Sequence, residues 1–323
     1  MLTNINISNS NNLDPFIRYF EKHRIEWKKF AKVHQIPEDV ASRTVWLSSR
    51  QVMSFLMDMM SHSNKRVGIE VGKLITVGQI STSLEESLKQ CHDLGEAIVT
   101  LIKLMPELSS HVVIWVEKIE GHWYLCHRGA YHPSTPGFDQ TEWFRSFALL
   151  SMCRLFMGED WVPEHAFMSF SEHLTKGLPI GFSKTAFSFD HSFGAIRIDL
   201  DDGFKPIPPS REGEAEWLQR VKRLSQTYAV LPFFGVDWFA KFLSMSARTL
   251  QRRLAEHGLS VKQLRDETRR DVAVQLLAQD GLSPEEASWR CGYNDLSNFN
   301  RAFRGWLNMT PAQYRRKHFQ CAQ

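Results

Sequence analysis

Two stretches near the end of the chain decide its fold: VDWFAKFLSMSARTLQRRLAEHG at 236–258 and SPEEASWRCGYNDLSNFNRAFRGW at 283–306. Each stretch contains a short helical pattern, a tight polar break and a second helical pattern. One face of the second helix is apolar, and the other carries cationic or amide side chains. This layout is typical of a helix-turn-helix unit, whose first helix braces a second helix in the major groove of DNA.

The first stretch has the residues that such a unit needs. Apolar residues recur at spacings of three and four between Val236 and Leu243, so one face of the first helix is apolar. Ser246 is placed to cap the second helix, in which Leu250 and Leu254 point inward. Arg pairs with guanine and Gln with adenine, and the outer face contains Arg248, Gln251 and Arg252. A solvated amphipathic helix has the same pattern, but the second copy downstream favours DNA binding.

The second stretch repeats the layout. Ser283 and Pro284 predict a helix start, Gly292 supplies the turn, and Asn294 or Asp295 caps the next helix. That helix has a buried stripe of Phe299, Ala302, Phe303 and Trp306, and an outer face of Ser297, Asn298 and Arg301. Residues 261–278 predict one long helix that joins the two units and spaces them along the DNA.

The segments SARTLQRRL and GYNDLSNFNRAFRGWLNMTPAQYRR, with their spacing, closely resemble the AraC/XylS family of transcription regulators. The resemblance covers about the last 90 residues. It implies that both units contact promoter DNA and that RNA polymerase is a partner. The base-reading residues that it implies are Arg248, Gln251, Arg252, Ser297, Asn298 and Arg301. Asn308 departs from the glycine that is frequent in the family, but Asn tolerates the left-handed conformation.

Charge is unevenly distributed along the chain. The net charge is only +3, yet the residues from Arg211 onward carry 18 Lys and Arg against 12 Asp and Glu. A basic C-terminal part behind an acidic N-terminal part fits a polyanion-binding module on a sensory domain. Cationic side chains beside the reading faces are expected to contact phosphates, which gives affinity without sequence information; they are Lys241, Arg304, Arg315 and Arg316.

The length of 323 residues is consistent with two or three domains. The five cysteines are scattered and have no C-x-x-C spacing, which favours a reducing compartment without a zinc site. No signal peptide and no apolar run of membrane-spanning length are evident, so we expect a cytoplasmic protein with no membrane association. No cofactor or metal is expected.

The N-terminal region mixes helices and strands. Residues 1–13 are rich in Asn and Ser and are expected to be loose; helices are expected at 14–35 with a break near His23, at 48–61, at 82–104 as one long helix and at 138–157. A β-hairpin is predicted at 111–117 and 123–127, and short strands are predicted at 166–170, 186–189 and 195–198. The stretch KPIPPSREG at 205–213 predicts a linker, followed by a connecting helix at 214–228.

Stretches such as VGIEVGKLITVGQ and STSLEESLKQCHDL resemble the arabinose-binding-like sensory domain of one subgroup of AraC-type regulators. This resemblance implies a small-molecule effector, such as a fatty acid or an amino acid, and permits a homodimer. Aromatic residues around the hairpin are candidates for the effector pocket: Trp115, Trp123, Tyr124 and Tyr131. Packing in the hairpin and core is the alternative role for them. The Met-rich face of the helix at 48–61 has the same two interpretations.

Some residues also fit a catalytic or a purely structural role. Cys126-His127-Arg128 is similar to the Pro-Cys-His-Arg nucleophile of DNA alkyltransferases, but Leu125 replaces the proline. His122 with His127, or His111 with His132, would be a metal site only if each pair converged. A third alternative is a ligand-independent regulator whose N-terminal domain only forms oligomers.

The sequence therefore predicts an α+β sensory and dimerisation domain at 1–204, a linker and connecting helix at 205–228, and an all-α DNA-binding domain at 229–323. The last domain holds two helix-turn-helix units joined by a long helix. The expected function is that of a DNA-binding transcription regulator, an activator that responds to a small molecule, and not that of an enzyme.

Overall fold

The computed structural model describes residues 5–63, 66–174, 179–209 and 214–319. Residues 6–212 form one compact unit, and residues 213–323 form another together with residues 1–5. The first unit is α+β and the second is helical, as expected. The helix predicted as a connector, α9 (Glu214–Tyr228), lies in the second unit. None of the described helices is both long and apolar enough to cross a membrane.

The N-terminal unit is built on a five-stranded sheet with the order β3-β4-β7-β5-β6. The predicted hairpin is confirmed as β3 (Val112–Ile119) and β4 (His122–Gly129). Glu120 and Gly121 connect the two strands at φ values of 51° and 85°, the positive values that tight hairpin turns favour. The remaining strands are β5 (His165–Phe167), β6 (Ala186–Ser188) and β7 (Gly194–Ile198); β5 and β6 are parallel, and the other pairs are antiparallel.

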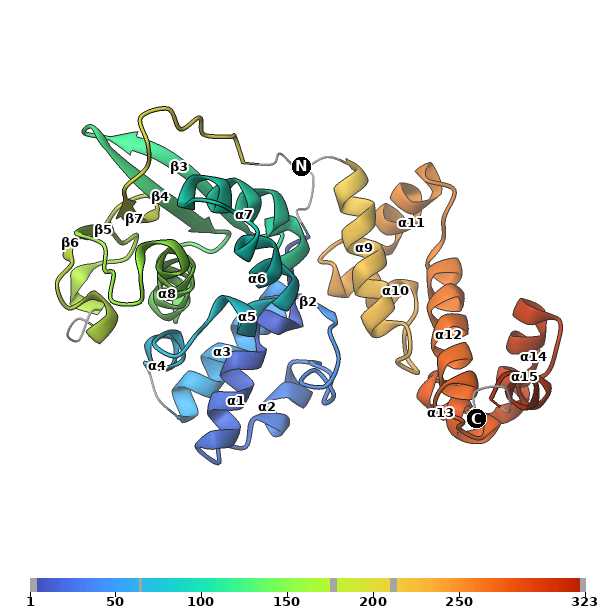
Figure 1. The fold of residues 1–323 in the computed structure, drawn as a ribbon. Helices are drawn as coiled ribbons and strands as arrows, with labels where there is room; N and C mark the ends of the chain where they lie inside the picture. Colours follow the sequence, from blue (N-terminus) through green and yellow to red (C-terminus); the bar gives the residue numbers. More distant parts are fainter. Residues whose placement is uncertain (1–4, 64–65, 175–178, 210–213, 320–323) are drawn as a thin grey trace. The chain divides into compact units, whose positions relative to one another are not determined.

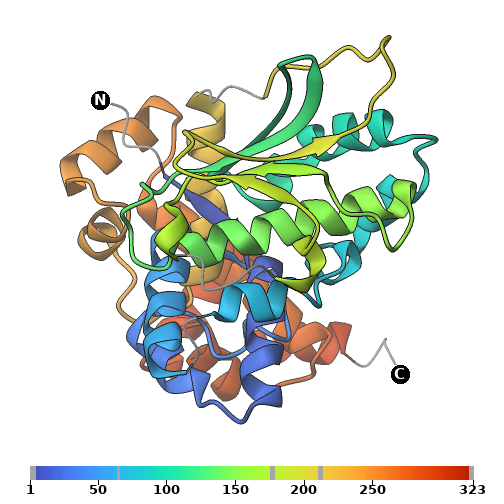
Figure 2. The ribbon, with the colours of Figure 1, turned by 90° about the vertical axis from the view of Figure 1, so that its left-hand side faces the viewer.

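The two faces of the sheet have different neighbours. One face of β4 carries Tyr124 and Cys126, which pack in a cluster with Phe167 and Ala195. The other face carries His127, which contacts Arg145 and Ser146 of α8 (Phe138–Met157). Figure 2 shows α8 running across the sheet. The predicted bounds of this helix, 138–157, agree with the structure.

The remaining helices of the N-terminal unit surround this layer. The break predicted near His23 separates α1 (Asp14–Lys22) from α2 (Trp27–Val33), and a capping box at Ser48 starts α3 (Ser49–His62). Shorter helices follow in chain order: α4 (Val67–Gly72), α5 (Val77–Ile80) and α6 (Thr82–Lys89). The helix α4 packs directly on α8.

Two expectations for this unit are wrong. The single helix expected at 82–104 is divided into α6 and α7 (Leu94–Leu108), because the side chain of Asp93 accepts a hydrogen bond from the amide of Glu96 and starts a new helix. Residues 7–13 are not loose. Strand β1 (Ile7–Asn9) pairs with β2 (Trp46–Ser48), and the side chain of Ile7 is fully buried. Residues 1–4 lie outside the described residues.

The C-terminal unit consists of α9 and six further helices in its described part. They are α10 (Val236–Phe242), α11 (Ala247–Glu256), α12 (Val261–Ala278), α13 (Pro284–Arg290), α14 (Leu296–Leu307) and α15 (Pro311–His318). The helix pair α10–α11 comes before α12 and the pair α13–α14 after it (Figure 1). The long α12 packs on α9, α13 and α15.

The capping residues fix where these helices begin. Ser246 and Ser283 cap α11 and α13 as predicted, with side-chain oxygens that accept from backbone amides. Of the two candidates for α14, Asp295 is the cap. Asn308 ends α14 in the left-handed region at φ 55°, which confirms that Asn takes this conformation here.

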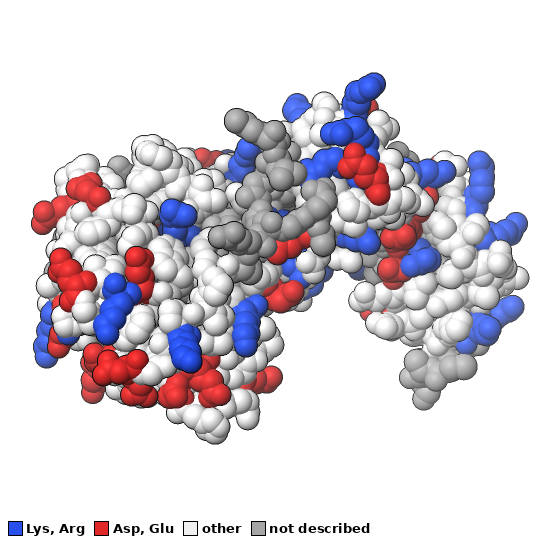
Figure 3. Space-filling view, turned by 90° about the horizontal axis from the view of Figure 1, so that it is seen from above, with Lys and Arg blue, Asp and Glu red and all other residues white. Residues whose placement is uncertain are grey.

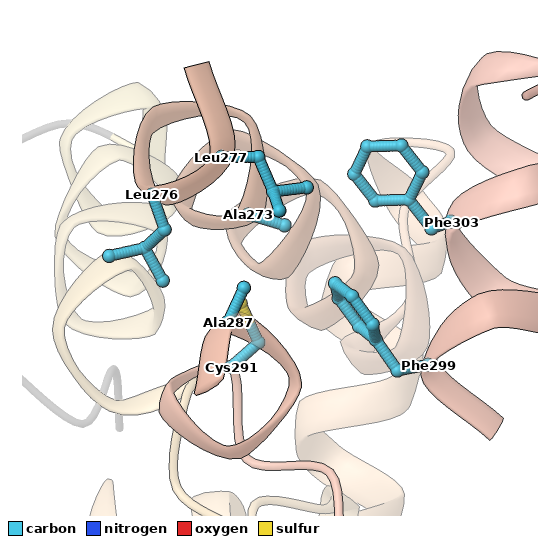
Figure 4. Close-up of a cluster of buried hydrophobic side chains, with 7 residues drawn as sticks. All are labelled: Ala273, Leu276, Leu277, Ala287, Cys291, Phe299 and Phe303. Carbon is cyan, nitrogen blue, oxygen red and sulfur yellow. The ribbon is translucent and has the colours of Figure 1, made fainter. Parts of the chain in front are cut away.

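A cluster of buried apolar side chains holds the second helix pair against α12. Phe299 and Phe303 of α14 share a cluster with Ala287 of α13 and with Cys291, the residue that follows α13 (Figure 4). The cluster is completed from α12 by Ala273, Leu276 and Leu277. These three side chains mark the face of α12 on which α13 and α14 pack.

Arg269, in the middle of α12, is buried and links the two halves of this unit. Its Nε donates to the carbonyl oxygen of Ala229 at 2.8 Å, and its Nη2 donates to that of Leu231 at 2.9 Å. Its guanidinium also lies over the ring of Tyr293, 4.8 Å from the centroid. Arg269 therefore joins the loop between α9 and α10 to the turn between α13 and α14.

The turn at Gly292 fits the same loop closely. Gly292 has φ 76°, and a Cβ at this position would lie 2.1 Å from the carbonyl oxygen of Val230. Gly258 has a similar φ of 69°, but a Cβ there would meet nothing within 4 Å. Only glycine satisfies both the backbone conformation and the close approach at Gly292.

We expect Gly258→Ala to lower the free energy of unfolding by about 1–2 kcal/mol through left-handed strain alone. Gly292→Ala should cost about 1–3 kcal/mol more, because its methyl group displaces the backbone at Val230. Amide hydrogen exchange of α9 to α15 in the full chain measures both effects. Equal losses in the two variants would contradict the close approach.

We expect Arg269→Met to lower the unfolding free energy of the C-terminal unit by about 3 kcal/mol or more, because two carbonyl groups lose a charged donor. The control is Arg270→Met, which removes a half-exposed guanidinium paired with Asp271. The control should change stability by about 0.5 kcal/mol at most. The same exchange measurement separates the two variants, and similar losses would show that Arg269 does not link the halves.

Candidate nucleic-acid interface and ligand cavity

The outer face of α11 presents the three side chains expected there. Arg248, Gln251 and Arg252 are exposed, whereas Leu250 and Leu254 on the inner face are fully buried. Arg252 forms an ion pair with Glu256 one turn later, at 3.4 Å. Within the described part of the chain, Arg248 and Gln251 have no side-chain hydrogen bond, so their donors and acceptors are available.

Arg253 differs from its neighbour Arg252. Only 7% of its surface is exposed, and its guanidinium stacks 3.8 Å from the ring centroid of Trp217 on α9. A cation held over an aromatic ring in this way contributes to packing. Arg253 therefore holds α11 against α9 and is not part of the outer face.

The outer face of α14 has the same character. Ser297, Asn298 and Arg301 are exposed, and the adjacent Phe299 is fully buried. The amide group of the Asn298 side chain donates to the carboxylate of Asp295, whose other oxygen caps the helix at 2.7 Å from the Asn298 backbone nitrogen. Arg301 makes no side-chain hydrogen bond to the described residues.

The candidate phosphate-binding residues are in two different environments. Lys241, Arg304 and Arg316 are exposed. Arg315 is partly buried, and its Nε donates to the carbonyl oxygen of Gly281 at 2.9 Å. Figure 3 shows Lys and Arg side chains along the right-hand side of the view, on the C-terminal unit.

The structure does not bring together the four aromatic residues proposed for an effector pocket. Trp115 and Tyr124 pack in the cluster on one face of the sheet. Trp123 is on the opposite face, where its ring lies edge-on to Phe204 with centroids 5.7 Å apart. Of these four residues, only Tyr131 lines an apolar cavity of the N-terminal unit.

This cavity has a volume of about 150 Å³. Its apolar lining comes from helices α1, α3, α5, α6, α7 and α8 and from strand β3, and includes Phe16, Met53, Leu56, Leu84, Leu101 and Leu149. Met53 is thus the one residue of the Met-rich face of α3 that lines the cavity, while Met60 lies beside Gly137. An apolar cavity with a few polar groups is the usual form of a small-molecule site.

Sequence reasoning missed the main polar group of the cavity, Arg145. Its Nε donates to Nδ1 of the buried His127 at 3.4 Å, and its Nη2 is buried without a hydrogen-bond partner. Burial, with the Arg145 cation second, holds the pKa of His127 well below its usual value. His127 is therefore neutral, accepts at Nδ1 and carries its proton on Nε2, which lies 3.4 Å from the hydroxyl of Ser146.

The carboxylate of Glu142, near Arg145, is hydrogen-bonded to Ser169. Glu142 is 1% exposed and accepts hydrogen bonds from the backbone nitrogen and hydroxyl of Ser169. Burial raises the pKa of Glu142, and Arg145 and Ser169 oppose this effect. The sequence signal that could have indicated this site is the pair Glu142 and Arg145, two charged residues within the otherwise apolar pattern of α8.

Cys126 is unsuited to nucleophilic chemistry. Its side chain is fully buried in β4, and burial, with Glu117 second, raises the pKa of its thiol to about 12. The thiolate is the reactive form, so the alkyltransferase alternative has neither an accessible nor an ionised nucleophile. The histidine pairs weighed for metal binding do not join any group of three His, Cys, Asp or Glu side chains that would hold a metal ion in the described part of the chain.

The C-terminal unit is similar to parts of known proteins. Residues 239–317 match the model of a helix-turn-helix domain. The transcriptional regulator VirS of Mycobacterium tuberculosis is 33% identical over 148 residues, which are 43% of this chain and 44% of VirS. The uncharacterized regulator Rv1395 of the same organism is 45% identical over 75 residues, 23% of this chain and 22% of the relative.

The chain therefore matches less than half the length of these curated relatives. Among solved structures, the transcriptional regulator CdpR from Pseudomonas aeruginosa is 17% identical, with a TM-score of 0.41 and coverage of 95% of this chain and 98% of that chain. Both curated relatives are named as transcriptional regulators. Over its C-terminal part, this chain is similar to helix-turn-helix transcriptional regulators.

Proposed function

We propose that the protein regulates transcription by binding promoter DNA through two helix-turn-helix units, α10–α11 and α13–α14. The observation that carries this proposal is the outer face of each second helix. On α11 and α14, exposed Arg and amide side chains stand opposite fully buried apolar ones. These side chains have the donors and acceptors that bind base edges in the major groove.

The spacing of the two units supports binding on one side of the DNA. The 18 residues of α12 give it a length of about 27 Å, which is comparable to the roughly 34 Å of one DNA turn. Arg269 and the apolar cluster hold this helix against its neighbours. In the proposed complex, α11 and α14 occupy successive major-groove segments, and Lys241, Arg304, Arg315 and Arg316 contact phosphates.

The N-terminal unit, in this proposal, senses a small molecule and changes the activity of the DNA-binding domain. The cavity beside Arg145 supports an effector over the ligand-independent alternative, which would need only a filled core. A homodimer and RNA polymerase are the further partners proposed, with activation as the outcome. The domain boundaries 1–204, 205–228 and 229–323 belong to the same proposal, with α9 as the helix that enters the DNA-binding domain.

We expect Arg301→Ala to weaken binding to the specific promoter site by about 1–3 kcal/mol and to relax the base preference at one position. Arg304→Ala, on the same helix, is the matched control for a phosphate contact. It should weaken binding to all sequences about equally and reduce the dependence on salt. Binding to a library of promoter variants at two salt concentrations distinguishes the variants. If Arg301→Ala weakens every sequence equally, Arg301 contacts phosphate instead.

We also expect Arg248→Ala and Arg301→Ala to relax different positions of the same promoter site. If two units bind successive major-groove segments, these positions are separated by about 10 base pairs. Selection of bound sequences by each full-length variant maps the positions. Loss of preference at the same position, or at none for Arg248→Ala, would exclude two independent reading helices.

A further inference from the structure

The cavity of the N-terminal unit contains one permanent cation and no acidic side chain among its described lining residues. That cation is Arg145, whose guanidinium has five N–H donors but makes one hydrogen bond to the described residues, through Nε to His127. The nearest carboxylate, Glu142, is occupied by Ser169. A buried donor without a partner costs stability unless something else binds it.

The polar and apolar groups of the cavity lie at different places. Nη1 of Arg145 is beside Gly129 at the end of β4, where a Cβ would lie 3.1 Å from it. Val112 pairs with Gly129 across the hairpin, and His111 and Tyr131, whose rings are 6.3 Å apart, are the adjacent cavity-lining residues. Arg145, His111 and Tyr131 thus lie near this end of the hairpin, whereas most of the remaining lining residues are apolar.

From this arrangement we infer that the cavity binds a small apolar monocarboxylate, whose carboxylate accepts hydrogen bonds from the Arg145 guanidinium and whose apolar body lies among the helices. A planar guanidinium matches the two oxygens of a carboxylate. Tyr131 supplies a further polar group at the same end.

The charge and the volume of the site limit the ligand. Glu142 interacts electrostatically with the Arg145 guanidinium, so a dianion such as phosphate meets more repulsion than a monocarboxylate and is disfavoured. The volume of about 150 Å³ is similar to that of a protein cavity that holds benzene. The ligand class that fits this volume is an aromatic or short-chain aliphatic acid.

This inference deepens the proposed function by naming the class of effector. Calorimetric titration of the full chain with benzoate and hexanoate tests it, and benzyl alcohol and hexanol are the neutral analogues. We expect the wild-type protein to bind the acids more tightly than the alcohols, because only the acids pair with the guanidinium.

Three variants locate the binding site. Arg145→Met keeps the side-chain volume and removes the charge; it should weaken acid binding about 10- to 100-fold, the value of a charged hydrogen bond, and leave alcohol binding unchanged. Retained alcohol binding also shows that the variant is folded. Ala148→Phe fills the cavity from α8 and should abolish binding of acids and alcohols alike. Arg128→Met removes an exposed guanidinium on β4 and should change neither.

Several results would overturn the inference: no binding of either acid to the wild type, equal affinity for acids and alcohols, or equal effects of Arg145→Met and Arg128→Met. If Arg145→Met does not fold, Arg145→Lys replaces it, and undiminished acid binding in a folded lysine variant would overturn the geometry of two parallel hydrogen bonds.

DNA binding by the same samples separates the two proposals. A chain that binds DNA but no acid retains the proposed function without this site, and one that binds acid but no DNA retains the site alone.

Discussion

The C-terminal unit depends on one buried cation. Arg269 projects from the middle of α12 and donates to the carbonyl oxygens of Ala229 and Leu231, while its flat guanidinium lies against Tyr293. The guanidinium donates hydrogen bonds to carbonyl groups of a loop that has no regular secondary structure, and the flat face of the guanidinium packs against an aromatic ring. The loop before α10 and the turn between α13 and α14 are therefore both held by the same residue of α12. A lysine, with a single point charge and no planar surface, does not provide these contacts together.

The helices of this unit were predictable because their signals are local. Ser246, Ser283 and Pro284 mark helix starts in the sequence, and apolar residues recur at helical spacing up to the observed ends. The contacts of the charged residues were not predictable. Arg253 and Arg269 occur in helices in which other arginines are solvated, and the partners that bury them, Trp217 and the loop after α9, come from elsewhere in the chain.

The N-terminal unit was predicted less completely, because its key pairings are long-range. The strand β1 has three residues, too few for a recognisable alternation, and it is ordered by β2 almost forty residues later. The hairpin itself was evident, but its aromatic residues were expected to converge. Alternation along a strand instead sends Trp123 to one face and Tyr124 to the other. Arg145 was overlooked because a cation in an amphipathic helix usually faces water.

The candidate base-reading side chains differ in conformational freedom, because some are held by a neighbouring side chain and others are not. Asn298 is held by the carboxylate of Asp295, and Arg252 is held by Glu256. Arg248, Gln251 and Arg301 have no such partner among the described residues, so they sample several rotamers in the free protein. Each of these three side chains loses about 0.5–1.5 kcal/mol of entropy when it becomes immobilised at an interface. In the proposed complex, the ordering cost therefore falls mainly on α11 and on Arg301, while Asn298 meets its base with its conformation already set.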